Sequence, residues 1–219
     1  RLRRRITPRP DAFQPKSRVA LRTRRAALAA LALCLAGLAN PQAAASGDTD
    51  KILWRLHDET TVETVLMRYD DRVTVCVSTQ VGCAMGCTFC ATGTTGWIRN
   101  LTRHEIVEQV IHYARRLDAT QDRVTNVVMM GMGEPLNNYE EVMAALRLLN
   151  DPKGFNLGAR HMSISTCGIV PGILKMAKEN FQINLAISLH SAIDDVRSKM
   201  MPVNRAYPLA KLMAAVRTY

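Results

Sequence analysis

Cys83, Cys87 and Cys90 form a CxxxCxxC run. Thiolates this close together can ligate an iron–sulfur cluster, whose complete 4Fe-4S form takes four cysteines. Three cysteines leave one iron of such a cluster open, and an open metal position is where a substrate or cofactor binds. The spacing therefore predicts a reactive 4Fe-4S site rather than a purely structural one.

Zinc binding and unrelated free thiols are the alternatives for this run. A structural zinc site takes four ligands, commonly in two pairs, and no second CxxC or HxxxH pair follows here, so that a histidine such as His104 would have to complete it. Disulfides between such close cysteines would be strained. Phe89 before the last cysteine favours the cluster. So do four glycines that let the backbone wrap closely around a compact core, Gly82, Gly86, Gly93 and Gly96.

The length and composition of the chain limit which class of protein it can belong to. The chain has 219 residues, 47% of them apolar, which suits one substantial domain with or without an appendage. Four of its six cysteines lie within fifteen residues, which indicates a metal site in a reducing compartment more than a disulfide framework. The net charge is +10, but residues 1–25 hold ten Lys or Arg and one Asp, so the rest of the chain is nearly neutral. The basic balance is therefore weak evidence for nucleic-acid binding by the folded part.

Residues 1–45 have a composition of their own. Residues 1–25 are basic and contain three prolines, which is typical of disorder, and residues 26–38 form an apolar run too short to span a bilayer. With the small residues at 43–46, this run imitates a secretory signal peptide. An organellar targeting segment and a helix of a degenerate N-terminal domain are the alternatives. We expect residues 1–45 to be one of these and infer no location from them.

Two segments rich in strand formers, 51–56 and 62–67, predict a β-hairpin within a small β accessory unit over residues 46–72. From residue 73 onward, predicted strands and helices alternate. Strands are expected over residues 73–77, 126–130, 161–166 and 183–190, and helices from a capping box at Thr102 and Glu105, from Tyr139, from Pro171 and from Leu209.

Apolar strands separated by helices indicate parallel βα units and an α/β fold. Right-handed crossovers would wind residues 73–219 into a partial barrel or an open sheet. In such folds, the loops after the carboxyl ends of the strands carry the active site. A polar or glycine-rich feature follows each predicted strand: the cysteine run, the turn at residues 131–134, Ser165, and residues 188–190. We expect these strand ends to converge on one mouth.

Together these motifs resemble the radical S-adenosylmethionine (SAM) enzymes, and more narrowly the RlmN-type adenine C2-methyltransferases of 23S rRNA and tRNA. The resemblance runs from about residue 50 to the end and rests on residues 75–83 leading into Cys87 and Cys90, on 100–102, on 127–136 with GMGEPL, on 165–166, and on 186–190 with ISLH. It implies a parallel partial barrel of radical SAM type with its core at 73–219, and a 4Fe-4S cluster and SAM as cofactors. A sister group that methylates carbon 8 of adenine shares most of these motifs. That activity is one alternative, and an inactive or structural metal-binding fragment is the other.

The resemblance also implies roles for single residues. Cys83, Cys87 and Cys90 would hold the cluster, and SAM would chelate the open iron through its amino and carboxylate groups. Gly133 and Glu134 would meet that amino group, since a carboxylate and carbonyls suit a cation. Further residues that would line the SAM pocket are Ser165, Ser188, Leu189 and His190. Without the resemblance, Glu134 reads as a turn acid before proline, and Ser188 and His190 read as a capped strand end.

Cys76 and Glu63 are expected to be catalytic by the same resemblance. A cysteine on a buried strand is ordinarily a small apolar residue, and Glu63 alone reads as an exposed strand acid. In the family, the thiol that Cys76 matches helps release the methylated product and forms a disulfide with a methyl-carrying cysteine near the C-terminus, while Glu63 matches the proton acceptor. Carbon 2 of adenine is not nucleophilic, so the family methylates a cysteine first and passes the carbon to the ring by radical chemistry.

The chain departs from the resembled pattern at both ends. The methyl-carrying cysteine of the family falls beyond residue 219, Cys167 is the only cysteine after the cluster run, and the last two units of a six-unit barrel are missing. The N-terminal helical domain that helps engage RNA is shortened or unrecognisable. We therefore expect a fragment that is inactive alone.

The resemblance also implies partners and a location. The implied partners are 23S rRNA, tRNA and an electron donor such as flavodoxin or ferredoxin. The family resemblance further implies a cytoplasmic monomer without a membrane segment.

Overall fold

The structure is a computed structural model that describes the backbone of residues 38–46 and 48–219 and the side chains from residue 48 onward. The predictions made for residues 1–37 lie outside this part. The strands are β1 (Leu38–Ser46), β2 (Thr49–Leu56), β3 (Thr61–Arg68), β4 (Val73–Cys76), β5 (Gln80–Gly82), β6 (Trp97–Asn100), β7 (Asn126–Met129), β8 (Met162–Thr166) and β9 (Asn184–Ile187). The α-helices are α2 (Ala91–Thr94), α3 (Arg103–Asp118), α4 (Tyr139–Asn150), α5 (Val170–Met176), α6 (Asp194–Met200), α7 (Val203–Ala206) and α8 (Leu209–Thr218), and the 3-10 turns are η1 (Pro135–Asn138) and η2 (Ala159–His161).

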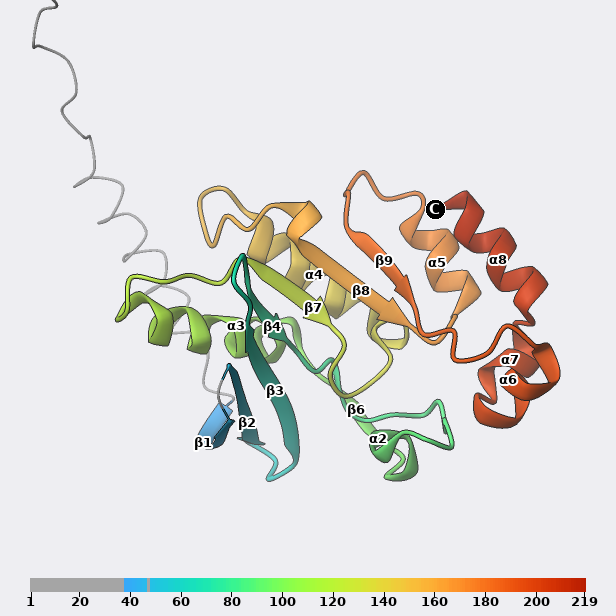
Figure 1. The fold of residues 1–219 in the computed structure, drawn as a ribbon, viewed down its shortest axis with the longest axis horizontal. Helices are drawn as coiled ribbons and strands as arrows, with labels where there is room; N and C mark the ends of the chain where they lie inside the picture. Colours follow the sequence, from blue (N-terminus) through green and yellow to red (C-terminus); the bar gives the residue numbers. More distant parts are fainter. Residues whose placement is uncertain (1–37, 47) are drawn as a thin grey trace, which may run out of the picture.

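One sheet organises the molecule, with the strand order β1-β2-β3-β4-β7-β8-β9 (Figure 1). The strands β1 to β4 are antiparallel neighbours, whereas β4, β7, β8 and β9 run parallel to one another. Helices α3, α4 and α5 lie in the crossovers between these parallel strands, which confirms the predicted α/β fold with parallel βα units. The predicted hairpin is β2–β3, and it continues this sheet. The proposed boundaries between the accessory unit and the core stay a prediction.

Helices cover one face of the sheet. Alternate residues of the parallel strands, such as Val127 and Ile164, are fully buried in the core, and so are Ile106, Leu146 and Ile173 of the three crossover helices. The capping box predicted for α3 is present: Thr102 accepts from the Glu105 N–H, and the Glu105 carboxylate accepts from the Thr102 N–H. An apolar stripe beyond this cap buries α3 against the strands.

The opposite face of the sheet is only half-buried. The register pairs Val65 with Cys76, Cys76 with Val128, and Val128 with Ser163, so these four side chains share that face. Each of them is of intermediate exposure. Since side chains alternate along a strand, Ser165 also belongs to this face. The face without crossover helices is therefore the one that carries polar and sulfur-bearing side chains.

Several elements were not predicted. The β5–β6 hairpin is short, α6 and α7 have seven and four residues, and β9 ends at Ile187 rather than at His190. Helix α6 buries only Arg197, so it offers no apolar stripe that a periodicity search would detect. Strand β1 was also not predicted. No helix in residues 38–46 and 48–219 is both long and apolar enough to cross a bilayer.

Candidate active site

The cysteine run lies in a loop directly after β5. The β5–β6 hairpin holds the loop closed, and the Cys83 N–H donates to the Gly96 carbonyl at 2.8 Å. Gly82 precedes this contact with φ 71°, and a Cβ there would lie 1.9 Å from the Gly96 oxygen. Only glycine fits both the left-handed backbone and the close approach. The hairpin therefore sets where the first thiol points.

The three thiols of the run are close enough to influence one another. Cys83 and Cys87 are 8% exposed, Cys90 is half-buried, and all three are free. Burial raises the pKa of Cys83 and Cys87, and a charge on the neighbouring thiols raises it further. Protonated thiols at neutral pH release their protons when a metal binds them. The loop thus presents a set of soft sulfur ligands, two of which are buried.

The donor set of this loop, three cysteine thiols, suits a 4Fe-4S cluster. In the part of the chain with described side chains, no three His, Cys, Asp or Glu converge on one point as ligands of one metal ion. A cubane needs no such point, because each cysteine binds a different iron. The loop also curls tightly, since a Cβ at Gly93 would lie 3.1 Å from the Cys87 carbonyl oxygen. His104, the fourth ligand of the zinc alternative, lies near Glu141 of α4.

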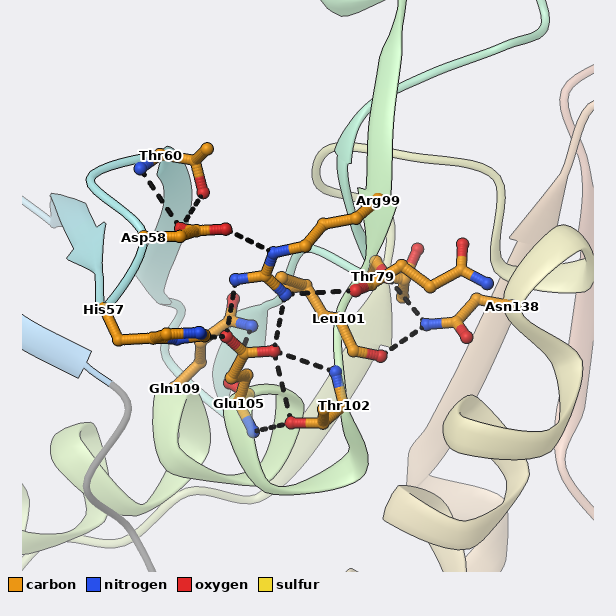
Figure 2. A network of polar contacts seen from close by, with 11 residues as sticks. His57, Asp58, Thr60, Thr79, Arg99, Leu101, Thr102, Glu105, Gln109 and Asn138 are labelled. Carbon is orange, nitrogen blue, oxygen red and sulfur yellow. Dashed lines mark hydrogen bonds and ion pairs between the residues drawn. The ribbon is translucent and has the colours of Figure 1, made fainter.

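An arginine anchors the outgoing arm of the loop. Arg99 of β6 makes two hydrogen bonds to the Glu105 carboxylate of α3, at 2.8 and 2.9 Å, and a third to Asp58 of the β2–β3 turn at 2.6 Å (Figure 2). Glu105 is 5% exposed, so its charge depends on this partner. Arg99 and Thr102 outweigh burial and lower the pKa of Glu105, and the Arg99 hydrogen bond lowers the pKa of Asp58. Three elements distant in sequence are tied together at this point.

A buried amide ties the two ends of the cysteine segment to each other. The Asn138 side chain donates to the carbonyls of Thr79 and Leu101, each at 2.8 Å, and the Leu101 N–H donates to the Thr79 carbonyl (Figure 2). Thr79 precedes the run and Leu101 follows it. Asn138 comes from the turn after β7, so this contact joins the loop to the neighbouring strand end.

Glu134 is buried at the carboxyl end of β7, with 3% exposure. Its carboxylate accepts from the N–H of Leu136 at 3.0 Å and from the N–H of Cys167, after β8, at 2.8 Å. Its own N–H donates to the Gln80 side chain at 2.8 Å. The preceding Gly133 has φ 102°, and a Cβ there would lie 2.6 Å from Gln80. The motif therefore joins three strand ends, and the SAM contact expected for Gly133 and Glu134 stays a prediction.

The remaining expected SAM residues come from the ends of β8 and β9. The hydroxyls of Ser165 and Ser188 lie 3.1 Å apart, and the Ser188 N–H donates to the Thr166 carbonyl. His190 has φ 57°, and its ring lies against that of Phe89, with centroids 4.1 Å apart. The cysteine loop thus touches the end of β9, and strand ends predicted to converge are neighbours. Leu189 next to His190 is exposed.

Cys76 and Glu63 lie on the half-open face of the sheet. Cys76 pairs with Val65, and Glu63 is two residues from Val65, so both side chains project to the same side. Burial raises the pKa of Cys76 to about 11. Glu63 is 44% exposed and forms an ion pair with Lys51 at 2.8 Å. The structure places these residues near each other in the sheet, and their catalytic roles stay a prediction.

Two charged residues of the site were not found from the sequence. Arg99 reads as an exposed residue of a short loop. Arg197 lies on an unpredicted helix, and it is fully buried. The only signal for Arg99 was its position beside the motif at residues 100–102, and charge beside a motif is common in solvated loops.

The fold and this set of strand ends define the class of protein. Residues 77–219 match the model of the radical SAM superfamily, and the chain belongs to that superfamily. A solved radical SAM methyltransferase from Sphaerobacter thermophilus is similar to it, with a TM-score of 0.79 and 51% identity over 81% of this chain and 53% of that chain.

Within the superfamily, the chain is similar to proteins named as RNA methyltransferases. Two proteins named "Probable dual-specificity RNA methyltransferase RlmN" are similar to this chain. The one from Bacillus mycoides is 53% identical over 174 residues, and the one from Chloroflexus aurantiacus is 56% identical over 179 residues. Each alignment covers 80% of this chain and 48% of the relative. The chain spans about half the length of the curated relatives it matches.

Proposed function

We propose that this chain carries the cluster- and SAM-binding part of an RNA methyltransferase of RlmN type, acting on carbon 2 of adenine in 23S rRNA and tRNA. The observation that supports the proposal most is the identity of 53–56% to proteins named dual-specificity RNA methyltransferases. The CxxxCxxC loop, with Cys83 and Cys87 buried and with contacts to the ends of β8 and β9, fits that chemistry.

Cys83, Cys87 and Cys90 would hold a 4Fe-4S cluster, and residues at the strand ends would hold SAM. The SAM-binding residues proposed are Gly133, Glu134, Ser165, Ser188, Leu189 and His190. When bound there, a cluster would provide the one-electron chemistry by which SAM is cleaved reductively. The hydroxyl pair of Ser165 and Ser188, at 3.1 Å, offers donors and acceptors suited to the polar parts of SAM.

Cys76 and Glu63 are proposed to handle the RNA base and its methyl group. They sit on the half-open face, which the crossover helices leave accessible. A thiol with a pKa of about 11 is neutral at pH 7, so it would need a base before it could act as a nucleophile on the methylated product. In the proposed scheme, a second cysteine carries the methyl group, and flavodoxin or ferredoxin is the electron donor to the cluster. The protein would act on its RNA substrates as a cytoplasmic monomer.

The experiment that tests the function is complementation. A strain lacking its own adenine C2-methyltransferase would be supplied with the gene that encodes this chain, read to its natural end, and its 23S rRNA and tRNA would be analysed by mass spectrometry. Methyl groups at carbon 2 of adenine are expected. Methylation at carbon 8 alone would favour the sister activity, and unmodified RNA in cells that contain the cluster-loaded protein would contradict both. A Cys87→Ala strain is the matched control.

A further inference from the structure

Helix α6 carries a fully buried arginine at the edge of the cysteine loop. Arg197 has 0% exposure and donates three hydrogen bonds. Its Nη2 donates to the carbonyl of Cys167 at the end of β8, its Nε to the carbonyl of Leu189 after β9 at 3.1 Å, and its Nη1 to the amide oxygen of Asn204. One guanidinium therefore joins the ends of two strands that carry expected SAM residues.

The same helix holds the cysteine loop. The Thr88 N–H donates to the Met200 carbonyl at 2.9 Å, and Thr88 directly follows Cys87. Cys87, Cys167 and Met201 pack together as a small buried cluster of their own. The Met201 N–H donates to the carbonyl of Arg197 at 2.7 Å, and the Arg197 side chain donates to the carbonyl of Cys167, so the arginine is bonded to two members of this cluster.

Arg197 forms no ion pair with a carboxylate in the part of the chain that the structure describes. Its three acceptors are two carbonyls and one amide, and no ion pair to it lies within 4 Å there. Asp194 and Asp195 are the acids of its own helix; Asp194 accepts from Asn204 and from the Leu209 N–H and acts on Arg197 only through space. Burying a charge without a counter-charge is costly. A nearby anion would offset that cost.

A three-cysteine 4Fe-4S cluster is such an anion. Three thiolates outweigh the charge of the iron–sulfur core, and reduction by one electron adds a further negative charge. Net charge and hydrogen bonding around a cluster set its reduction potential. The positive charge of Arg197 acts on Cys87, where it opposes the effect of burial on that thiol. A cation at this place would favour the reduced cluster.

We propose that Arg197 is a positioning residue of the cluster and SAM site, whose guanidinium fixes the ends of β8 and β9 and whose charge raises the reduction potential of the cluster. This inference rests on the proposed cluster and SAM site. The positioning role and the effect of the charge can be separated, because one substitution removes only the planar set of guanidinium donors and another also removes the charge. Arg197→Lys keeps the charge but cannot make three bonds in one plane, whereas Arg197→Gln removes the charge.

The test measures the cluster rather than turnover. Wild-type protein, Arg197→Lys, Arg197→Gln and the exposed control Arg205→Gln on α7 would be reconstituted anaerobically. Iron content, the reduction potential from an EPR-monitored titration, and the SAM dissociation constant would be measured for each. We expect both Arg197 variants to bind SAM about tenfold more weakly, since each loses charge-assisted hydrogen bonds. The potential should become more negative in Arg197→Gln, stay near the wild-type value in Arg197→Lys, and be unchanged in Arg205→Gln.

Equal potentials in wild type and Arg197→Gln, or an equal shift in the Lys and Gln variants, would overturn the role of the charge. If the Arg197 variants do not fold, Asn204→Ala keeps the guanidinium but frees its Nη1, and it should weaken SAM binding with little change in potential. Unchanged SAM affinity in Asn204→Ala would overturn the positioning role. A wild-type chain that takes up no cluster would overturn the proposed function itself, which is a distinct result.

Discussion

The Glu134 carboxylate accepts the backbone N–H of Cys167 at 2.8 Å, which ties the turn after β7 to the end of β8. Its other oxygen accepts the N–H of Leu136. Both carboxylate oxygens thus accept from buried backbone N–H groups. A buried N–H group without a hydrogen-bond partner is costly. Glu134 therefore stabilises the fold whether or not SAM is bound. A substitution of Glu134 should change the stability of the free protein.

Glu134→Gln should lower the free energy of unfolding by about 1–3 kcal/mol. The amide keeps one acceptor oxygen, but its NH₂ group must face one of the two backbone N–H donors. Urea unfolding at pH 7 measures the effect. The matched control is Glu140→Gln, because the Glu140 side chain is 76% exposed and, among the described residues, its ion pair is with Lys175 on the surface. Equal stability of the two variants would contradict the bridging role of Glu134.

Gly133→Ala should be more damaging than Gly96→Ala. Both glycines have positive φ, at 102° and 76°, so each alanine pays roughly 1–2 kcal/mol of backbone strain. At Gly133 the new Cβ would also lie 2.6 Å from Gln80, whereas at Gly96 nothing lies within 4 Å. Thermal unfolding and iron uptake measure the difference. Melting temperatures that fall equally in both variants would show that the close approach to Gln80 does not matter.

The Asp58–Arg99 contact should make stability sensitive to acid. The hydrogen bond from Arg99 lowers the pKa of Asp58 in the folded state. A lowered carboxyl pKa contributes stability above the unfolded value of about 3.9, and this contribution is lost as the pH falls from there toward the folded value. Wild type should therefore exceed Asp58→Asn in the free energy of unfolding at pH 6, with a smaller gap at pH 3. The same gap at both pH values would contradict this origin.

Cys76 should react slowly with alkylating reagents at pH 7.5. Burial raises its pKa to about 11, so its thiolate fraction is about 300-fold below that of a free cysteine with a pKa of about 8.5. Peptide mapping after iodoacetamide treatment of the folded protein measures the rate, and the rate should rise with pH. Urea should abolish the protection. Labelling of Cys76 as fast in native as in unfolded protein would contradict its buried, neutral state.

The elements that could be predicted best from the sequence are those with a clear hydrophobic period or a glycine turn. The capping box of α3, the strands β4, β7 and β8, and the placement of Glu134 and Ser165 at strand ends follow from periodicity and from glycine turns. Arg197 could not be found this way, because α6 has seven residues and buries no apolar side chain. An arginine there reads as solvated, and only the ends of β8 and β9, distant in sequence, turn it into a buried link.

Register explains a second difference. The sequence placed Glu63 and Cys76 on separate strands, but only the pairing of Val65 with Cys76 puts their side chains on one face. A shift of one residue would send one of them into the helix-covered core. Likewise, Arg99 became an anchor because the β2–β3 turn brings Asp58 to the cysteine hairpin. Long-range contacts of this kind leave no periodic trace in a single sequence.

Iron and sulfide analysis after anaerobic reconstitution tests the cysteine site most directly. Wild-type protein, Cys76→Ala and Cys167→Ser should each bind about four irons and four sulfides per chain, and SAM should change the EPR spectrum of the reduced cluster. Cys83→Ala, Cys87→Ala and Cys90→Ala should each lose most of the iron. Full loading of these three variants, or a wild-type chain that binds tight zinc and no iron–sulfur cluster, would contradict the site.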